Sequence, residues 1–510
     1  MKQYVALLLS LVLGFTGISN GGFQTNYQSD SLNEQALDEF ILGQMEKQNL
    51  PGVAVAITQG EDTVYLKAFG EASRDVPLET NTPMYIGSIS KSFTALAIMQ
   101  LAEKDGLDID APVIDYLPWF SLADQQAAQT ITIRNLLNHT SGLSDFGYMP
   151  DLDPETSIQN GVRSMVNAKL TAPIGTTFQY FNSNYAILGA VVEEASGRTY
   201  EEYVQENIFE PLQMNDSFAG ESFARSAGLT DGYGSFFSFS LPRRQEFKQY
   251  DLPAGYLSIS VEDLSKYLRA QINDGEFQNV SILSKDGITA MHTPNEEINS
   301  SYGMGWFQYE KNGYQVIEHG GTNENYHSAA YLLPELDMTI SILVNKNGLL
   351  NSLWGNPQLN DGVFAIVTGN TAPSGGLSMR LLGLLLLAGF IINMVFNVQA
   401  LFKMKTWYEK FKLQKGFSRM WDVCSHFVIT AALLILLPLG VEAYLQKGFS
   451  GKKAFIKLQI LCCGLDWEFF LICSRVYGRS LFYYERKILS LPNKEVRIRK
   501  MRLSKKSVLG

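Results

Sequence analysis

The pattern of hydrophobic and polar residues places strands near both ends of residues 26–376 and helices between them. Short apolar or alternating segments of the kind that form strands occur at Val53–Thr58, Thr63–Ala68, Gln315–Glu318, Ser328–Leu333 and Met338–Val344. Gly60 lies in the turn between the first two. Helices are expected from a capping box at Ser31-Leu-Asn-Glu34 to about Gln48, at Ser88–Lys104 before Gly106, and at Leu359–Val367.

This order of elements predicts an α+β fold. Strands from both ends of the segment are expected to meet in one antiparallel sheet, and the helices inserted between them to build a mostly helical subdomain. No internal repeat or low-complexity linker interrupts residues 26–376. A body of about 350 residues can bury a large core and hold a cleft between its two parts.

Three long apolar runs follow this body, at residues 381–402, 423–441 and 456–476. Each is long enough to cross a bilayer as a helix, and the first holds 22 residues without a charge. The third contains Lys457, Asp466 and Glu468, each of which costs about 2.5–3.5 kcal/mol near the bilayer centre. An interfacial or re-entrant helix is therefore its alternative. Residues 1–22 are typical of a signal peptide, with an uncleaved N-terminal anchor as the alternative.

Charge is divided along the chain in the same way. The net charge of the 510 residues is −10, but residues 1–380 contribute −24 and residues 381–510 contribute +14. Lysine and arginine gather at 403–419 and in the tail, 479–510, so the positive-inside rule places both in the cytoplasm and the acidic body outside. The expected partner of the C-terminal part is the lipid bilayer, whereas the acidic balance argues against nucleic acid.

Cysteine usage refines the expected compartment. All four cysteines lie in the C-terminal part, namely Cys424, Cys462, Cys463 and Cys473. The body outside then has neither disulfides nor thiol chemistry, which favours a bacterial cell membrane over a eukaryotic secretory route. No H-E-x-x-H or related pattern occurs, so neither a metal nor another cofactor is expected.

Candidate chemistry begins at Ser88-Ile-Ser-Lys91. Positions three apart share a helix face, so Lys91 is expected to lie over the Ser88 hydroxyl. A partly buried lysine near a helix N-terminus can lose its charge and take the proton that makes serine nucleophilic. The pattern is weak alone, because Ser450–Lys453 matches it too. The ordinary interpretation of an isolated match is a helix start with a solvated lysine.

Two further segments change that interpretation. Tyr180-Phe-Asn182 precedes a helical pattern, and a bend there would point the phenol and the amide into one cleft. A phenol can pass a proton when a cation lies near it. His319-Gly320-Gly321-Thr322 lies between two strand patterns, and its paired glycines would let a substrate backbone approach a strand edge. Taken singly, the first segment indicates a packed aromatic residue and the second a turn.

In this order the three motifs resemble those of the penicillin-binding protein and class C β-lactamase family of active-site serine hydrolases. Flanking segments agree, among them YIGSISKSFTA, TIRNLLNHTSGL, NYAILGAVVEEASG and PAGYLSISVEDLSKYL. The resemblance implies a β-lactamase/transpeptidase-like fold and acyl transfer through an acyl-enzyme. It makes Ser88 the nucleophile, Lys91 its activator and Tyr180 the general base for attack and acid for the leaving group. The residues implied to bind substrate are Asn182, His319, Gly320, Gly321 and Thr322, with the backbone N–H groups of Ser88 and Thr322 forming the oxyanion hole.

The sequence also departs from the family pattern. Phe181 stands where serine is frequent, and His319 stands where many relatives carry lysine. Histidine is mostly neutral at pH 7, which weakens binding of a substrate carboxylate and the case for an efficient β-lactamase. In the NHTSGL segment, His139 is expected to have a structural role. The segment Gly234–Arg244 holds three phenylalanines and is interpreted either as ordinary core or as a cleft-lining or membrane-facing loop.

Several functions remain open within this resemblance. The leading hypothesis is a membrane-anchored D,D-peptidase on D-amino-acid-containing cell-wall peptides, with peptide or β-lactam-like small molecules as its ligands. A prodrug-activating D-amino-acid peptidase of a nonribosomal-peptide pathway is the alternative, because such enzymes also carry three C-terminal spans. Esterase or β-lactamase activity is a further variant. A β-lactam sensor is disfavoured, since the cytoplasmic segments leave no room for an output domain.

Overall fold

The computed structural model describes residues 32–236, 239–348, 350–373 and 378–385, together with 387, 388, 391 and 395. All of them belong to the first of two units into which the chain divides, Met1–Gln399. The predicted segments 1–22, 423–441, 456–476 and 479–510 lie outside the described residues, and 381–402 lies only partly inside them. Within the described part of the chain, no helix has both the length and the apolar content needed to cross a bilayer.

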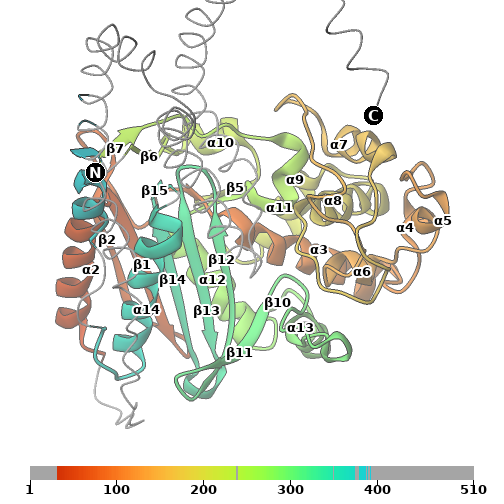
Figure 1. The fold of residues 1–510 in the computed structure, drawn as a ribbon. Coiled ribbons are helices and arrows are strands. Elements are labelled where there is room, and N and C mark those ends of the chain that lie inside the picture. The colour runs from red at the N-terminus through yellow and green to blue at the C-terminus, as the bar shows by residue number, and fades with distance from the viewer. Residues whose placement is uncertain are drawn as a thin grey trace, which may run out of the picture. The chain divides into compact units, whose positions relative to one another are not determined.

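A seven-stranded antiparallel sheet forms the centre of the molecule, in the order β11-β12-β13-β14-β1-β2-β3 (Figure 1). Its strands are β1 (Gly52–Gln59), β2 (Asp62–Ser73), β3 (Val76–Pro77), β11 (Phe307–Lys311), β12 (Tyr314–Thr322), β13 (His327–Leu333) and β14 (Met338–Val344). The register pairs Val53 of β1 with Val344 of β14, so the two ends of the body are joined in one sheet. The predicted α+β fold and its antiparallel sheet are confirmed.

Helices cover both faces of this sheet. Val53, Val55 and Ile57 of β1 share a buried cluster with side chains of α2 (Glu34–Gln48) and α14 (Asn356–Val367). Ala54 and Ala56 belong to the other cluster, which includes side chains of α3 (Ser90–Asp105) and α12 (Val261–Ile272). Alternate residues of a strand point to opposite faces, so one apolar strand supplies both cores.

A mostly helical part lies beside the sheet and is built around α3 and α8 (Asn182–Ser196), both buried over most of their length. The remaining helices are α4 (Val113–Tyr116), α5 (Gln125–Ala128), α6 (Ile133–Leu137), α7 (Ile158–Arg163), α9 (Tyr200–Val204), α10 (Glu221–Ser226), α11 (Leu252–Gly255) and α13 (Lys285–His292). Single 3₁₀ turns occur at Gly87–Ile89, Ser164–Asn167, Gln249–Asp251, Glu296–Ile298 and Pro334–Leu336, and π-helical turns at Gln205–Phe209 and Asn351–Gly355.

Three small sheets complete the fold. One joins β4 (Met84–Tyr85), β8 (Ser258–Ile259) and β5 (Ser217–Phe218), and another joins β9 (Glu276–Phe277) to β10 (Val280–Ser281). The third contains β15 (Lys346–Asn347), β6 (Tyr233–Phe236) and β7 (Phe239–Pro242). The first of these fixes the chain just before Ser88, because Met84 and Tyr85 pair with Ile259 and Ser258.

Three local expectations need correction. The N-cap of α2 is Asn33, whose Oδ1 accepts a hydrogen bond from the Ala36 N–H at 3.0 Å, and not Ser31. Ser88 lies in a 3₁₀ turn that precedes α3, so the α-helix begins two residues later than expected. The strand predicted at Gln315–Glu318 extends to Thr322, because the segment from His319 to Thr322 pairs with β13 as far as His327, so these residues form a strand edge and not an isolated turn.

Candidate active site

Ser88 lies at the contact between the 3₁₀ turn Gly87–Ile89 and strand β12. Gly87 has φ +54°, and a Cβ at this position would come within 2.4 Å of the Thr322 backbone nitrogen. A side chain would therefore both strain the backbone and collide with the strand, which explains the glycine before the serine. The resulting close approach brings the backbone of the Ser88 turn to the N–H of Thr322.

Lys91 is fully buried one turn after Ser88. Its Nζ donates hydrogen bonds to Ser88 Oγ at 3.1 Å and to the Ala254 carbonyl oxygen of α11 at 2.6 Å. Burial lowers the pKa of Lys91 to about 7, although the carboxylates of Asp251 and Asp145 act in the opposite direction. The predicted pairing of Ser88 with a lysine that can lose its proton is present in the structure.

Tyr180 lies against the same lysine. Its half-buried ring is 4.9 Å from Lys91 Nζ, measured to the ring centroid. Burial raises the pKa of Tyr180 above its ordinary value, and the neighbouring Ser88 side chain only partly offsets this effect. The phenol is therefore protonated at neutral pH, the state in which it can donate a proton.

His139 packs against Tyr180; the sequence predicted a structural role for this histidine but not the contact with Tyr180. It is fully buried with φ +56°, and its ring centroid lies 4.4 Å from that of Tyr180. Its Nδ1 accepts hydrogen bonds from the Phe181 backbone N–H at 3.3 Å and from Asn184 Nδ2 at 3.0 Å. Burial, with a further contribution from the charge of Lys91, holds the pKa of His139 well below its ordinary value. A neutral imidazole thus fixes the backbone on which Tyr180 sits.

His319 is buried on β12, with 3% of its surface exposed. Its Nδ1 donates to the Gly320 carbonyl oxygen at 2.7 Å, and its Nε2 lies 3.4 Å from the hydroxyl of Tyr302. The rings of Tyr180 and Phe307 also lie beside it, with centroids 6.2 and 5.6 Å away. Burial and the charge of Lys91 lower the pKa of His319 to about 3, so this position carries no positive charge at neutral pH.

The two glycines of the third motif have different roles. A Cβ on Gly321 would lie 1.9 Å from the Ile86 carbonyl oxygen and 2.1 Å from Ser328 Oγ, so Gly321 permits β12 to pack against the segment before Ser88. Gly320 is exposed, and its nearest neighbour would be 3.9 Å away. The sequence predicted that both glycines would let a substrate backbone approach the strand edge. In the structure only Gly320 leaves that edge open.

Two asparagines complete the surroundings. Asn182 begins α8, and its Oδ1 is buried with no hydrogen-bond partner among the described residues. No hydrogen bond joins Asn182 to Ser88 or Lys91 in this part of the chain. Asn323, which the sequence did not single out, donates from Nδ2 to the Gly255 carbonyl oxygen at 2.9 Å and so links the end of β12 to α11. A buried amide oxygen without a partner can accept a hydrogen bond from a ligand.

The site therefore combines a serine hydroxyl, a buried lysine and a protonated phenol beside an antiparallel sheet, the arrangement of an active-site serine hydrolase with a β-lactamase/transpeptidase-like fold. Residues 37–354 match the family described as Beta-lactamase, and the chain belongs to this family.

Comparisons with individual proteins agree with this membership. The chain is 27% identical over 324 residues to "Protein flp" of Staphylococcus aureus (strain MW2), a match covering 62% of this chain and 64% of that protein. It thus spans less than two thirds of the length of such curated relatives. It is 25% identical over 334 residues to "Unguisins hydrolase ungD'" of Aspergillus campestris, with 61% of each chain covered.

Two solved structures are also similar. The octameric penicillin-binding protein homologue from Pyrococcus abyssi superimposes with a TM-score of 0.58 at 28% identity, covering 68% of this chain and 79% of that one. A class C beta-lactamase shares the fold with a TM-score of 0.55 at 20% identity, covering 66% of this chain and 97% of the other.

Proposed function

We propose that the chain is a membrane-anchored serine hydrolase that forms an acyl-enzyme on Ser88, with its catalytic body outside a bacterial cell membrane. The observation that carries the proposal is the 3.1 Å contact between Ser88 Oγ and the buried Nζ of Lys91. With a pKa of about 7, Lys91 is neutral in a large fraction of molecules at physiological pH. A neutral amine at this distance can accept the hydroxyl proton of serine.

The acylation step follows from this geometry. Lys91 takes the proton of Ser88 as Oγ bonds to the substrate carbonyl carbon, and the carbonyl electron pair moves onto its oxygen. That oxyanion is stabilised by the backbone N–H groups of Ser88 and Thr322. When the carbonyl re-forms, the bond to the leaving nitrogen or oxygen breaks, and Tyr180 supplies the proton that the leaving group needs. Tyr180 then recovers a proton from the Lys91 ammonium group.

In deacylation Lys91 acts first as the base and then as the acid. A water molecule gives its proton to neutral Lys91 and bonds to the acyl carbon, and Ser88 Oγ leaves with a proton from the same lysine. The raised pKa of Tyr180 keeps the phenol protonated at neutral pH, so the proton that the leaving group needs is in place, whereas too little phenolate is present for Tyr180 to act as the base. Lys91 then acts as the general base.

The substrate class we propose is a peptide that contains D-amino acids, such as a cell-wall stem peptide cleaved by a D,D-peptidase. Family membership and similarity to a penicillin-binding protein homologue support this choice. Neutral His319 favours substrates without a free carboxylate beside the scissile bond.

The neutral state of His319 also supports a second candidate, a prodrug-activating D-amino-acid peptidase. Such an enzyme cleaves an internal amide, so no carboxylate has to be bound beside the reacting carbonyl. A neutral residue at position 319 therefore weakens substrate binding less in that reaction than in a carboxypeptidase, which must bind a terminal carboxylate.

Product analysis on synthetic peptides tests these assignments. The intact protein in membranes is incubated with an acyl-D-Ala-D-Ala peptide, with its C-terminal amide and with an N-acyl-D-Asn peptide, and Ser88→Ala membranes serve as the control. Ser88-dependent cleavage between the two D-Ala residues supports the D,D-peptidase, and faster cleavage of the amide supports the role of neutral His319. Cleavage of only the D-Asn peptide supports the second candidate. Equal turnover by the Ser88→Ala protein would exclude both.

A further inference from the structure

The hairpin formed by β6 and β7 has an apolar face that points away from the protein. Its register pairs Phe236 with Phe239 and Gly234 with Leu241, so these residues share one face. Phe236, Phe239 and Leu241 are 55%, 47% and 49% exposed. Exposed apolar patches of this kind commonly mark a contact with another molecule or with a membrane.

The polar face of the hairpin points inward. Ser235 Oγ donates a hydrogen bond to Asn351 Oδ1 at 2.7 Å, and Ser240 Oγ donates to the Asn49 carbonyl oxygen at 2.7 Å. A hairpin packed on a water-soluble body ordinarily turns its apolar side chains to the core and its polar side chains to solvent. The arrangement here is the reverse, with Phe239 and Leu241 about half exposed on the outer face.

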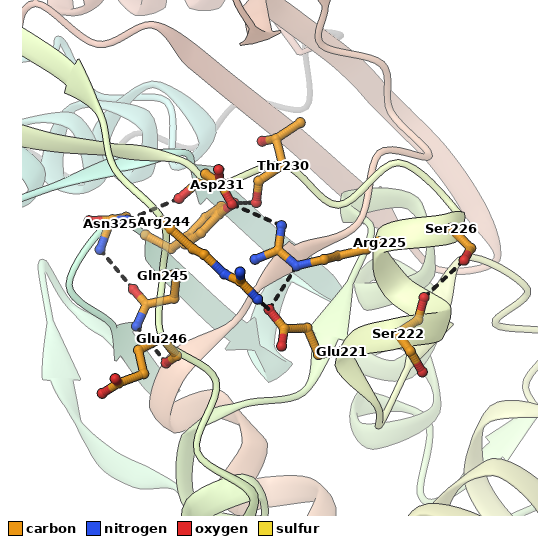
Figure 2. A network of polar contacts seen from close by, with 11 residues as sticks. Glu221, Ser222, Arg225, Ser226, Thr230, Asp231, Arg244, Gln245, Glu246 and Asn325 are labelled. Atoms are coloured by element: carbon orange, nitrogen blue, oxygen red, sulfur yellow. Dashed lines mark hydrogen bonds and ion pairs between the residues drawn. The ribbon is translucent and has the colours of Figure 1, made fainter. Parts of the chain in front are cut away.

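The hairpin is held firmly at its base by the polar network in Figure 2. Arg225 of α10 pairs with Asp231 at 2.8 Å, just before β6, and Glu221 lies 3.7 Å from Arg244, just after β7. Asn325 donates from Nδ2 to the Asp231 carbonyl oxygen at 2.9 Å. Because Asn325 follows the third motif by three residues, the network ties the orientation of the hairpin to that of the active site.

The residues just before the long uncharged run lie near the same end of α2 as the hairpin. Ser378 Oγ donates to the Lys47 carbonyl oxygen at 3.1 Å, and the Met379 N–H donates to Gln48 Oε1 at 3.3 Å. These acceptors adjoin Asn49, to which the hairpin is bonded, so both segments meet the end of α2 (Figure 1). After Arg380 the chain continues into residues 381–402, which carry no charge.

The charged and aromatic side chains near the hairpin also fit a contact with the bilayer. Arg243 and Arg244 at the base of the hairpin pair with Glu324 at 2.5 Å and with Glu221 at 3.7 Å, and they are still 51% and 72% exposed. Exposed arginines near a membrane can also contact anionic lipid phosphates. Trp354, in the π-helical turn that also holds Asn351, is 44% exposed. Aromatic residues with arginines beside them are typical of the membrane interface.

We propose that the apolar face of the β6–β7 hairpin inserts into the interfacial region of the bilayer from which residues 381–402 emerge. This inference rests on the membrane anchoring proposed above. The hairpin and the anchor then provide two separate points of attachment, and together they fix the height and tilt of the Ser88 site above the membrane.

Depth measurement on the full chain tests the inference. Cys424, Cys462, Cys463 and Cys473 are replaced by serine, and one cysteine is introduced by Phe239→Cys, or by Leu241→Cys as a second position on the same face. An environment-sensitive NBD label is attached, and the protein is reconstituted in nanodiscs of phosphatidylethanolamine and phosphatidylglycerol. Val280→Cys is the matched control, because Val280 is 37% exposed on a different hairpin, β9–β10.

The expected result is blue-shifted NBD emission at 239 and 241 that nitroxide-labelled lipids quench, with water-like and unquenched emission at 280. If the label at position 239 gives the same emission as the label at position 280, the inference is overturned. A blue shift without lipid quenching would also overturn it, because it indicates a protein partner. Extraction of the chain by carbonate would refute the anchoring as well, whereas loss of Ser88 chemistry alone would leave the depth result unaffected.

Discussion

At the scale of single residues, burial is the dominant physical effect in this site. Lys91, His139 and His319 all have pKa values below their ordinary values, and burial is the first cause in each case. For Lys91 the unfolded chain binds its proton more tightly, so burial costs stability at neutral pH, and this cost shrinks as pH rises from about 7 toward the ordinary lysine value. The catalytic body is thus less stable at neutral pH than it would be without a buried lysine beside Ser88.

The pH dependence of acylation should report Lys91. The rate of Ser88 acylation by a neutral ester is expected to rise about tenfold per pH unit below the lysine pKa and to level off above it, since only the neutral amine accepts the proton. The midpoint should lie near pH 7. Stopped-flow acylation measures it, with Lys91→Arg as an inactive control whose guanidinium stays charged. A profile that is flat through neutral pH would contradict the assignment of Lys91.

The neutral state of His319 gives a second residue-scale prediction. In His319→Lys, acylation by benzylpenicillin, which carries a carboxylate, should rise about tenfold or more relative to a neutral ester, because a charged hydrogen bond contributes about 1.5–3 kcal/mol. Competition labelling with a fluorescent penicillin measures the ratio, and His319→Gln should leave it unchanged. An equal ratio in the lysine and glutamine variants would show that charge at position 319 does not select the substrate.

Residue identities in the site were more predictable than their surroundings. The local spacing of Ser88 and Lys91 determines their contact, so the sequence pattern predicted it. The contact between His139 and Tyr180 joins two segments about 40 residues apart in the chain, and no periodicity encodes it. The different roles of Gly320 and Gly321 likewise depend on Ile86, which approaches β12 only in the folded chain.

At the scale of elements, the approach of β12 to the turn Gly87–Ile89 positions the nucleophile. Gly321→Ala should lower the free energy of unfolding by about 1–3 kcal/mol and reduce acylation, because its Cβ would meet the Ile86 carbonyl oxygen. Gly320→Ala is the matched control for stability and should change it by no more than about 0.5 kcal/mol, since its Cβ would make only an ordinary contact, 3.9 Å from the Ser328 carbonyl oxygen. Urea unfolding compares the two variants, and ester turnover is measured for Gly321→Ala. Equal losses in the two would argue against this packing role.

The length of an element determined how well the sequence predicted it. Strands β1, β13 and β14 were predicted to within one residue at each end, because five or more apolar positions define them. The two-residue strands β4, β5 and β8 were not predicted, since β8 pairs with β5 about 40 residues before it and with β4 more than 170 residues before it. β12 was predicted only in its first half, because the glycines that end the apolar pattern continue the strand by packing against the Ser88 turn.

At the scale of the whole molecule, the division of charge makes a prediction about orientation. In spheroplasts that express the full chain, added protease should digest the catalytic body and leave a tag after residue 510 intact, because the basic segments 403–419 and 479–510 are retained inside. In inverted vesicles the pattern should be reversed. Immunoblots against the tag and the body measure both. Digestion of the tag in intact spheroplasts would show that residues 456–476 do not cross, or that the orientation is the opposite one.

The central claim is that Ser88 forms an acyl-enzyme, and covalent labelling tests it most directly. Membranes that contain the intact protein or Ser88→Ala are treated with a fluorescent fluorophosphonate, and the labelled residue is identified by mass spectrometry of the tryptic peptides. The account predicts one adduct, on Ser88, that is absent from the variant although the variant unfolds at the same temperature. Equal labelling of a folded Ser88→Ala protein, or no adduct on the folded intact protein, would contradict it.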